Sequence, residues 1–274
     1  LMRISLCNEV VRDLHFEAQC ALAASLGYDG LEVAPFTLDA EAPQLLPASR
    51  RVALRRAASD AGSAITSLHW LLLAPSGLSI TSADAALRAK TLDVMERLVG
   101  LAADLGATLL VHGSPGQRRV EADGDAARAE EAMAKAGEAA ARHGVTYCVE
   151  PLDPGQTNWC TSVAEGAAII ERIGNPALRT MLDTCSAGNG ESENVVALLE
   201  RFIPTGAVAH VHFNDRNKRG PGQGADRFGP ILAALKRTGY SGFAAVEPFD
   251  YVPDGPTSAA RAIGYLRALE ESIA

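Results

Sequence analysis

The chain has 274 residues, of which 47% are hydrophobic and 21% are charged, a composition typical of a soluble globular protein with a sizeable core. Its formal net charge of −8 argues against a partner nucleic acid bound through a broad basic face. No apolar run reaches the length of a membrane span, and no charged-then-apolar leader begins the chain, so we expect neither a membrane span nor a signal peptide.

The five cysteines are scattered along the chain without CxxC spacing. This pattern indicates reduced thiols in a cytoplasmic protein, not a disulfide framework or a zinc finger.

Strand-like segments alternate with helix-like segments from one end of the chain to the other. Several helix-like segments end in a glycine that suits a helix C-cap, and the strand starts recur every roughly 30 to 40 residues, as expected of β-α units. The predicted strands span residues 3–6, 30–34, 64–70, 107–112, 144–150, 178–183, 207–213 and 243–247.

Eight such units predict an α/β fold, a single (β/α)8 TIM barrel that covers residues 1–274. A doubly wound open sheet is the alternative. It is disfavoured because no GxGxxG motif follows the first strand, and because eight even repeats suit closure better than an open sheet. No composition shift or linker marks a second domain.

Seven of the eight predicted strands carry an ionisable residue at or near their ends. The carboxyl ends of barrel strands converge on one face, where such enzymes carry out their chemistry. A single carboxylate there is commonly a helix N-cap or a surface residue, but seven consecutive strands are hard to explain by capping. These residues are Glu32, His69, His112, Glu150, Asp183, His212 and Glu247.

The seventh predicted strand contains two histidines, His210 and His212. Strand side chains repeat every two residues, so both histidines lie on the same side of the strand. One of them can then point into the space that the strand lines. A pair of satisfied core histidines is the alternative for this motif taken alone.

Two glutamates stand in the same motif, Val149-Glu150-Pro151 and Val246-Glu247-Pro248. The proline disfavours helix at the glutamate and removes the next backbone donor, so each glutamate is held extended at its strand end. Carboxylates and histidines from different strands are costly to bury unpaired, and a divalent cation removes that cost. Two glutamates, an aspartate and a histidine suit Mn²⁺, Mg²⁺ or Co²⁺ better than a structural zinc, with Zn²⁺ left open.

The chain resembles the xylose-isomerase-like barrel superfamily in the spacing of Glu150, Leu182-Asp183-Thr184, His212, the loop 219–224 and Val246-Glu247-Pro248. Within it, the chain is most similar to ketose 3-epimerases of the tagatose and psicose type and to their sugar-phosphate isomerase/epimerase relatives. The resemblance covers essentially the whole chain and is strongest from Gly144 onward.

This resemblance implies that Glu150, Asp183, His212 and Glu247 bind one divalent metal ion, with Mn²⁺ favoured over Mg²⁺, Co²⁺ and Zn²⁺. It also implies that Glu150 and Glu247 flank the substrate as an acid/base pair. They would exchange a proton at the carbon beside the carbonyl through an enediolate.

The resemblance also implies a set of substrate-binding residues, in which this chain departs from the family. Lys218 lies six residues after His212, where the family has a substrate-binding arginine, and Arg219 is its substitute. Ser186 stands where the epimerases have a histidine, and Gln156 stands where they have a glutamate. These departures point to a different sugar or a different reaction, as does the loss of the two-pronged arginine donor.

His69 and His112 take positions that bind extra zinc ions in a branch of the superfamily that cleaves abasic DNA. Ser186 and Phe228 stand where those enzymes have further histidines, so we do not expect a complete three-zinc cluster. We interpret His69 and His112 as substrate-contacting residues, with satisfied core histidines as the alternative.

The sequence therefore predicts a metal-dependent isomerase or epimerase that acts on a small ketose or a related polyhydroxy carbonyl compound. A metal-dependent dehydratase of the inosose or dehydroshikimate type is the main alternative, and its product would lack a hydroxyl. An abasic-site endonuclease is disfavoured by the acidic charge and the missing ligands, and a non-catalytic binding barrel by the intact set of metal carboxylates. The resemblance also implies a homodimer or a homotetramer, with a sugar or polyol ketone as the small-molecule partner.

Overall fold

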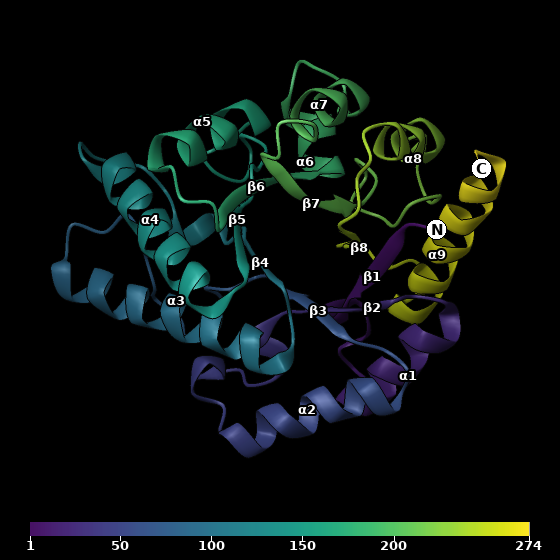
Figure 1. Ribbon diagram of the computed structural model, residues 1–274, viewed down its shortest axis with the longest axis horizontal. Helices are drawn as coiled ribbons and strands as arrows, with labels where there is room; N and C mark the ends of the chain where they lie inside the picture. The colour runs from purple at the N-terminus through teal and green to yellow at the C-terminus, as the bar shows by residue number, and fades with distance from the viewer. Residues whose placement is uncertain (274) are drawn as a thin grey trace.

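The computed structural model describes residues 1–273 and contains a closed barrel of parallel strands in sequence order, surrounded by helices (Figure 1). The predicted α/β TIM-barrel fold is therefore confirmed. The strands are β1 (Arg3–Cys7), β2 (Gly30–Val33), β3 (Ile65–Leu68), β4 (Leu109–His112), β5 (Thr146–Val149), β6 (Leu178–Asp183), β7 (Val208–Phe213) and β8 (Phe243–Val246).

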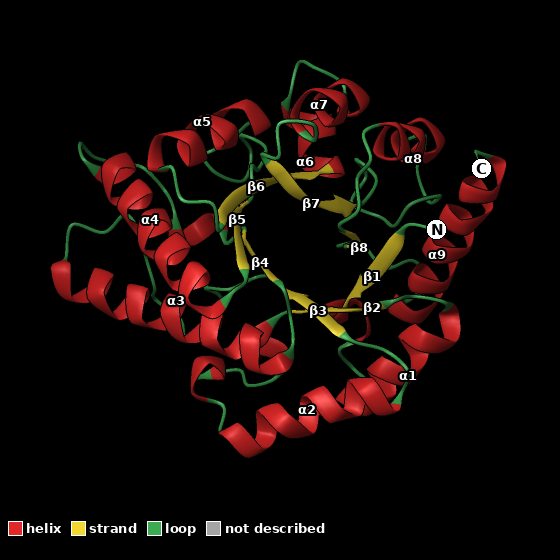
Figure 2. Cartoon of the chain, viewed as in Figure 1, coloured by secondary structure: helices red, strands yellow, loops and turns green. Residues whose placement is uncertain are grey.

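The helices lie outside the barrel and cover its strands (Figure 2). They are α1 (Phe16–Leu26), α2 (Ala48–Asp60), α3 (Ala85–Leu105), α4 (Asp125–His143), α5 (Val163–Ile173), α6 (Thr184–Gly190), α7 (Val195–Phe202), α8 (Phe228–Arg237) and α9 (Gly255–Ser272). The expected glycine caps are present at Gly27 and Gly106, which adopt φ of 93° and 82° at the ends of α1 and α3. Within residues 1–273, no helix combines the length and the apolar character needed to cross a membrane.

The barrel closes between its first and last strands, β1 and β8, which pair in parallel with Arg3 opposite Phe243. The N-terminal residues contact the C-terminal helix α9 beside the β1–β8 pair. The backbone N–H of Met2 donates to a Glu270 carboxylate oxygen at 2.6 Å, and Arg267 donates to the Met2 carbonyl at 2.7 Å. The strands are buried on both faces because the helices cover the outside and side chains fill the inside.

Four strands, β2, β3, β5 and β8, end one or two residues earlier than predicted. The third strand was expected to reach residue 70, but β3 ends at Leu68 because Trp70 leaves the extended region with φ of 52°. His69, Glu150 and Glu247 directly follow their strands, yet each backbone N–H still donates to the neighbouring strand, at 3.1, 3.0 and 3.1 Å. These ladder bonds fix the directions of the three side chains at the barrel mouth.

Candidate metal centre and substrate pocket

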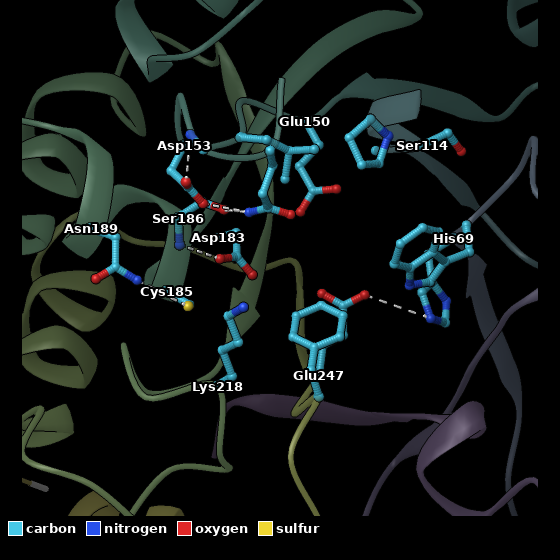
Figure 3. A pocket seen from close by; sticks show the side chains of 17 residues that line it. His69, Ser114, Glu150, Asp153, Asp183, Cys185, Ser186, Asn189, Lys218 and Glu247 are labelled. Atoms are coloured by element: carbon cyan, nitrogen blue, oxygen red, sulfur yellow. Dashed lines mark hydrogen bonds and ion pairs between the residues drawn. The ribbon is translucent and has the colours of Figure 1, made fainter. Parts of the chain in front are cut away.

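The four predicted metal ligands meet at the carboxyl ends of strands β5 to β8. One ligand atom from each of Glu150, Asp183, His212 and Glu247 lies within 4.8 Å of the others, and all four side chains are buried. The Nδ1 atom of His212 is 2.8 Å from Glu247 Oε2, 3.5 Å from Glu150 Oε1 and 4.0 Å from Asp183 Oδ2. Figure 3 shows the three carboxylates pointing toward one another across the floor of a pocket.

The donor set fits a divalent cation. Three buried carboxylates repel one another, and the buried Nδ1 of His212 has no hydrogen-bond partner. Burial raises the pKa of Asp183 to about 6, with Glu150 adding to the shift and His212 opposing it. Burial also raises the pKa of Glu247 to about 8, where His212 opposes the shift and Glu150 adds to it. A bound cation would relieve this repulsion and hold the carboxylates ionised.

Contacts with neighbouring elements hold the carboxylates of Asp183 and Glu150 in place. Asp183 caps α6 by accepting from the Ser186 N–H at 2.6 Å, and its other oxygen accepts from Asn214 Nδ2 at 2.9 Å. Glu150 lies against Gly113, where a Cβ atom would come within 2.3 Å of Glu150 Oε2. A larger residue at this position would therefore displace the carboxylate. Sequence reasoning missed Asn214 and Gly113, although each directly follows a strand with a terminal polar signal.

A buried glutamate lies beneath the four ligands. Glu32 Oε1 accepts from His212 Nε2 at 2.6 Å, Glu32 Oε2 lies 2.7 Å from His210 Nε2, and the Ser67 hydroxyl also donates to it. Burial alone would raise the pKa of Glu32, but His210 and His212 hold it well below its ordinary value. The core-histidine alternative describes His210, whereas His212 faces the ligand group. The strand-end pattern included Glu32 but gave it no role.

His69 lines the pocket and pairs with Glu9, a further residue that sequence reasoning missed. His69 Nε2 lies 2.8 Å from Glu9 Oε2 and 3.8 Å from Glu247 Oε1. Burial alone would lower the pKa of His69, but Glu9, Glu32 and Glu247 raise it to about 9. Glu9 belongs to a short 3-10 helix, Asn8–Val11, that follows β1, and its position after a strand was the only sequence signal.

A cavity of about 440 Å³ opens above the ligand group. This volume lies within the range of about 300–1,000 Å³ typical of small-molecule sites. Three of the four non-glycine residues with positive φ among residues 1–273 line it, namely Trp70 (52°), Ser114 (39°) and Lys218 (69°). Backbone strain of this kind persists where surrounding contacts impose it, and it clusters at functional sites.

Two of the three departures from the epimerase pattern, Gln156 and Ser186, meet at one edge of the cavity. Gln156 Nε2 donates to Ser186 Oγ at 3.1 Å and to Asp153 Oδ2 at 2.5 Å, and both Gln156 and Ser186 line the cavity. This edge presents neutral hydrogen-bonding groups backed by one carboxylate. It suits the hydroxyls of a polar substrate.

Lys218 reaches the cavity from the loop after β7. Its backbone N–H donates to the Asp215 carbonyl at 2.8 Å, and its carbonyl accepts from the N–H groups of Phe249 and Asp250 at 2.8 and 2.9 Å. These bonds maintain its positive φ. Figure 3 shows the Lys218 side chain directed toward the space between Asp183 and Glu247.

Two predicted substrate residues do not reach the cavity. His112 is fully buried with its Nδ1 2.7 Å from the Tyr147 hydroxyl, and burial, reinforced by Arg118, lowers its pKa to about 3. Only one of its ring nitrogens is satisfied, because the buried Nε2 has no hydrogen-bond partner within residues 1–273. Arg219 donates through Nε to Asp250 at 2.8 Å, which holds its side chain away from the pocket.

The closed barrel places the protein in the class of (β/α)8 barrels. Its buried group of carboxylates and a histidine lies at the carboxyl ends of the strands, where enzymes of this class carry their active sites. The sequence model of the family described as "Xylose isomerase-like TIM barrel" matches residues 20–269, and the chain belongs to this family. The resemblance inferred from the motifs is thereby confirmed.

Two relatives of the chain are named as 3-epimerases. The chain is 28% identical to a D-psicose 3-epimerase of Agrobacterium fabrum over 233 residues, which cover 82% of this chain and 76% of that protein. It is 30% identical to an L-ribulose 3-epimerase of Mesorhizobium japonicum over 179 residues, 64% of this chain and 59% of that protein. A crystal structure of 3-keto-D-glucoside 4-epimerase from E. coli superposes with a TM-score of 0.84 at 19% identity, covering 98% of this chain and 100% of that one. At this identity the superposition supports the fold alone.

Proposed function

We propose that the protein is a divalent-metal-dependent epimerase or isomerase that acts on a small ketose or a related polyhydroxy carbonyl compound. The observation that carries this proposal is the grouping of Glu150 and Glu247 with Asp183 and His212 around one buried point that opens into a cavity. Relatives named as ketose 3-epimerases support the same reaction class.

Glu150, Asp183, His212 and Glu247 would hold one cation. Their three carboxylates and one imidazole favour Mn²⁺, with Mg²⁺, Co²⁺ and Zn²⁺ as alternatives. When bound, such an ion polarises a carbonyl and stabilises the negative charge that develops on its oxygen.

Glu150 and Glu247 act as the acid/base pair. One carboxylate removes the proton from the carbon beside the carbonyl, which gives an enediolate, and the other returns a proton. Return to the opposite face of that carbon gives the epimer, and return to the former carbonyl carbon gives the isomer.

Polar and apolar groups on different walls of the cavity would orient the substrate. Lys218, Gln156 and Ser186 offer donors and acceptors to its hydroxyls. Trp70 and Phe249, whose rings meet edge to face at 6.5 Å, form an apolar wall. Contacts on two sides would hold a flexible polyol so that its reacting carbon lies above the ligand group.

The proposal is tested by incubating candidate ketoses with the metal-loaded enzyme in D₂O and following deuterium at the carbon beside the carbonyl. The wild type should incorporate solvent deuterium. Glu247→Gln should slow incorporation by about 10²-fold or more, because an amide accepts no proton. Arg219→Ala, which changes a residue outside the cavity, is the matched control and should exchange normally. Full exchange by Glu247→Gln would contradict the assignment, and a product that lacks a hydroxyl would identify a dehydratase instead.

A further inference from the structure

We propose that Glu32 is a positioning residue that fixes the orientation and tautomer of His212, so that Nδ1 of His212 faces the cation. This inference rests on the proposed metal centre. It concerns a side chain that belongs neither to the four ligands nor to the cavity wall.

The two ring nitrogens of His212 face opposite environments. Nε2 donates to Glu32 Oε1 at 2.6 Å, and Nδ1 lies 2.8 Å from Glu247 Oε2 within the ligand group. A neutral imidazole carries one N–H donor and one lone-pair acceptor. A carboxylate accepts hydrogen bonds and donates none, so a proton on Nε2 is retained whenever Nδ1 gives up its own. The lone pair that becomes available on cation binding is then the Nδ1 lone pair.

The surroundings of Glu32 keep it in the acceptor role. Both of its oxygens are fully buried, and two donors reach them: His212 Nε2 on one oxygen and the Ser67 hydroxyl on the other, where His210 Nε2 also lies at 2.7 Å. The Cys7 thiol adds a weaker contact at 3.9 Å.

Barrel packing alone does not account for a glutamate at this position. Interior positions of such barrels are filled mostly by branched apolar side chains, and a buried carboxylate costs free energy unless it is paired. Glu32 comes from β2 and reaches His212 on β7, and these strands are not neighbours in the sheet. Its hydrogen bond therefore spans the barrel interior, which is how a carboxylate beyond a metal-binding histidine orients the ring.

The test compares wild type with Glu32→Gln in two measurements that do not depend on activity. Titration of metal-stripped protein with Mn²⁺ gives the dissociation constant, and ¹⁵N NMR of histidine-labelled, Zn²⁺-loaded protein reports which nitrogen of His212 carries the proton. We expect Glu32→Gln to weaken Mn²⁺ binding by about 10- to 100-fold and to remove the single protonated-Nε2 signature. The glutamine amide can donate to Nε2, which favours the wrong tautomer.

Two further variants separate positioning from general destabilisation. Arg219→Ala, which changes a residue outside both the ligand group and the cavity, is the matched control, and its Mn²⁺ affinity should stay within about twofold of wild type. Glu32→Asp keeps the carboxylate but draws it back by one methylene, so we expect an intermediate affinity if Glu32→Gln fails to fold. The melting temperatures of the metal-free variants serve as the folding control.

Unchanged Mn²⁺ affinity and an unchanged Nε2–H signal in folded Glu32→Gln would overturn the role of Glu32 and leave the proposed function intact. Conversely, a wild-type protein that binds Mn²⁺ through His212 Nδ1 but exchanges no deuterium into any ketose would overturn the proposed reaction. The role of Glu32 would stand in that case.

Discussion

The floor and the rim of the pocket are built in different ways. The floor, formed by Glu150, Asp183, His212 and Glu247, consists of buried side chains at or next to strand ends. The rim, formed by Trp70, Gln156, Ser186, Lys218 and Phe249, comes mostly from loops, and Phe249 remains 44% exposed. Floor residues contact one another across the barrel, whereas rim residues face open space. The strands thus fix the chemistry, and the loops can vary the substrate around it.

The largest effect is expected from Asp183→Asn, which breaks the floor at one ligand. Free metal at about a hundred times its dissociation constant should stabilise the wild type by roughly 2.7 kcal/mol, a shift of several degrees in Tm. The variant should lose this shift, because a neutral amide is a poorer cation ligand. Thermal melting of metal-stripped protein with and without Mn²⁺, Mg²⁺, Co²⁺ or Zn²⁺ measures it. An equal shift in wild type and variant would remove Asp183 from the site.

Gly113→Ala should displace a floor residue without changing any charge. The new methyl group would come within 2.3 Å of Glu150 Oε2, so the carboxylate must move. We expect kcat/KM to fall by about 10²-fold, the cost of a displacement of about 1 Å at a reacting group. Gly116→Ala is the matched control, because its Cβ would meet nothing within 4 Å. Equal activity of the two variants would show that Glu150 tolerates the shift.

Lys218→Ala should affect the rim alone. Loss of a charged hydrogen-bond donor costs about 1.5–3 kcal/mol, so KM should rise by about tenfold or more while Mn²⁺ affinity stays the same. Arg219→Ala removes only a partly exposed ion pair with Asp250 and should change KM by less than about threefold. Steady-state kinetics with the best ketose tests both variants. A larger effect at Arg219 than at Lys218 would reverse the assignment.

The smallest expected effect is a pH dependence of metal stabilisation. The pKa of Glu247 is raised to about 8 and that of Asp183 to about 6, so both bind protons more tightly in the folded metal-free protein than in the unfolded chain. The stability from this protonation is full below about pH 4 and is lost as pH rises through 6 and 8. Cation binding needs the ionised forms. The Tm difference between loaded and metal-free protein should therefore grow by a few degrees from pH 5.5 to 8, and a constant difference would contradict these shifts.

The alternation of eight strand-like and helix-like segments was sufficient to predict the barrel, and the polar residues at the strand ends placed the four proposed ligands at one mouth, because both patterns are local in the sequence. The strand-end pattern could not show which of His69 and His112 lines the pocket, because each stands at the end of a predicted strand. His112 turns to the Tyr147 hydroxyl on the neighbouring strand, whereas His69 pairs with Glu9 across the mouth. Such partners lie 35 and 60 residues away along the chain.

The same limit explains two other differences between prediction and structure. Lys218 and Arg219 are adjacent in sequence, and the loop geometry decides which one enters the pocket: Lys218 adopts a positive φ, and Asp250 holds Arg219 outside. The contact from Glu32 to His212 spans 180 residues and two non-neighbouring strands. No periodicity or motif in the sequence predicts the hydrogen bond between Glu32 and His212, which becomes visible in the closed barrel.

The most direct test of the metal centre is anomalous X-ray diffraction from a crystal soaked in Mn²⁺. We expect one strong anomalous peak within coordination distance of His212 Nδ1 and of carboxylate oxygens from Glu150, Asp183 and Glu247. A peak between Glu9 and His69 instead, or no peak at a Mn²⁺ concentration that saturates the thermal shift, would contradict the account.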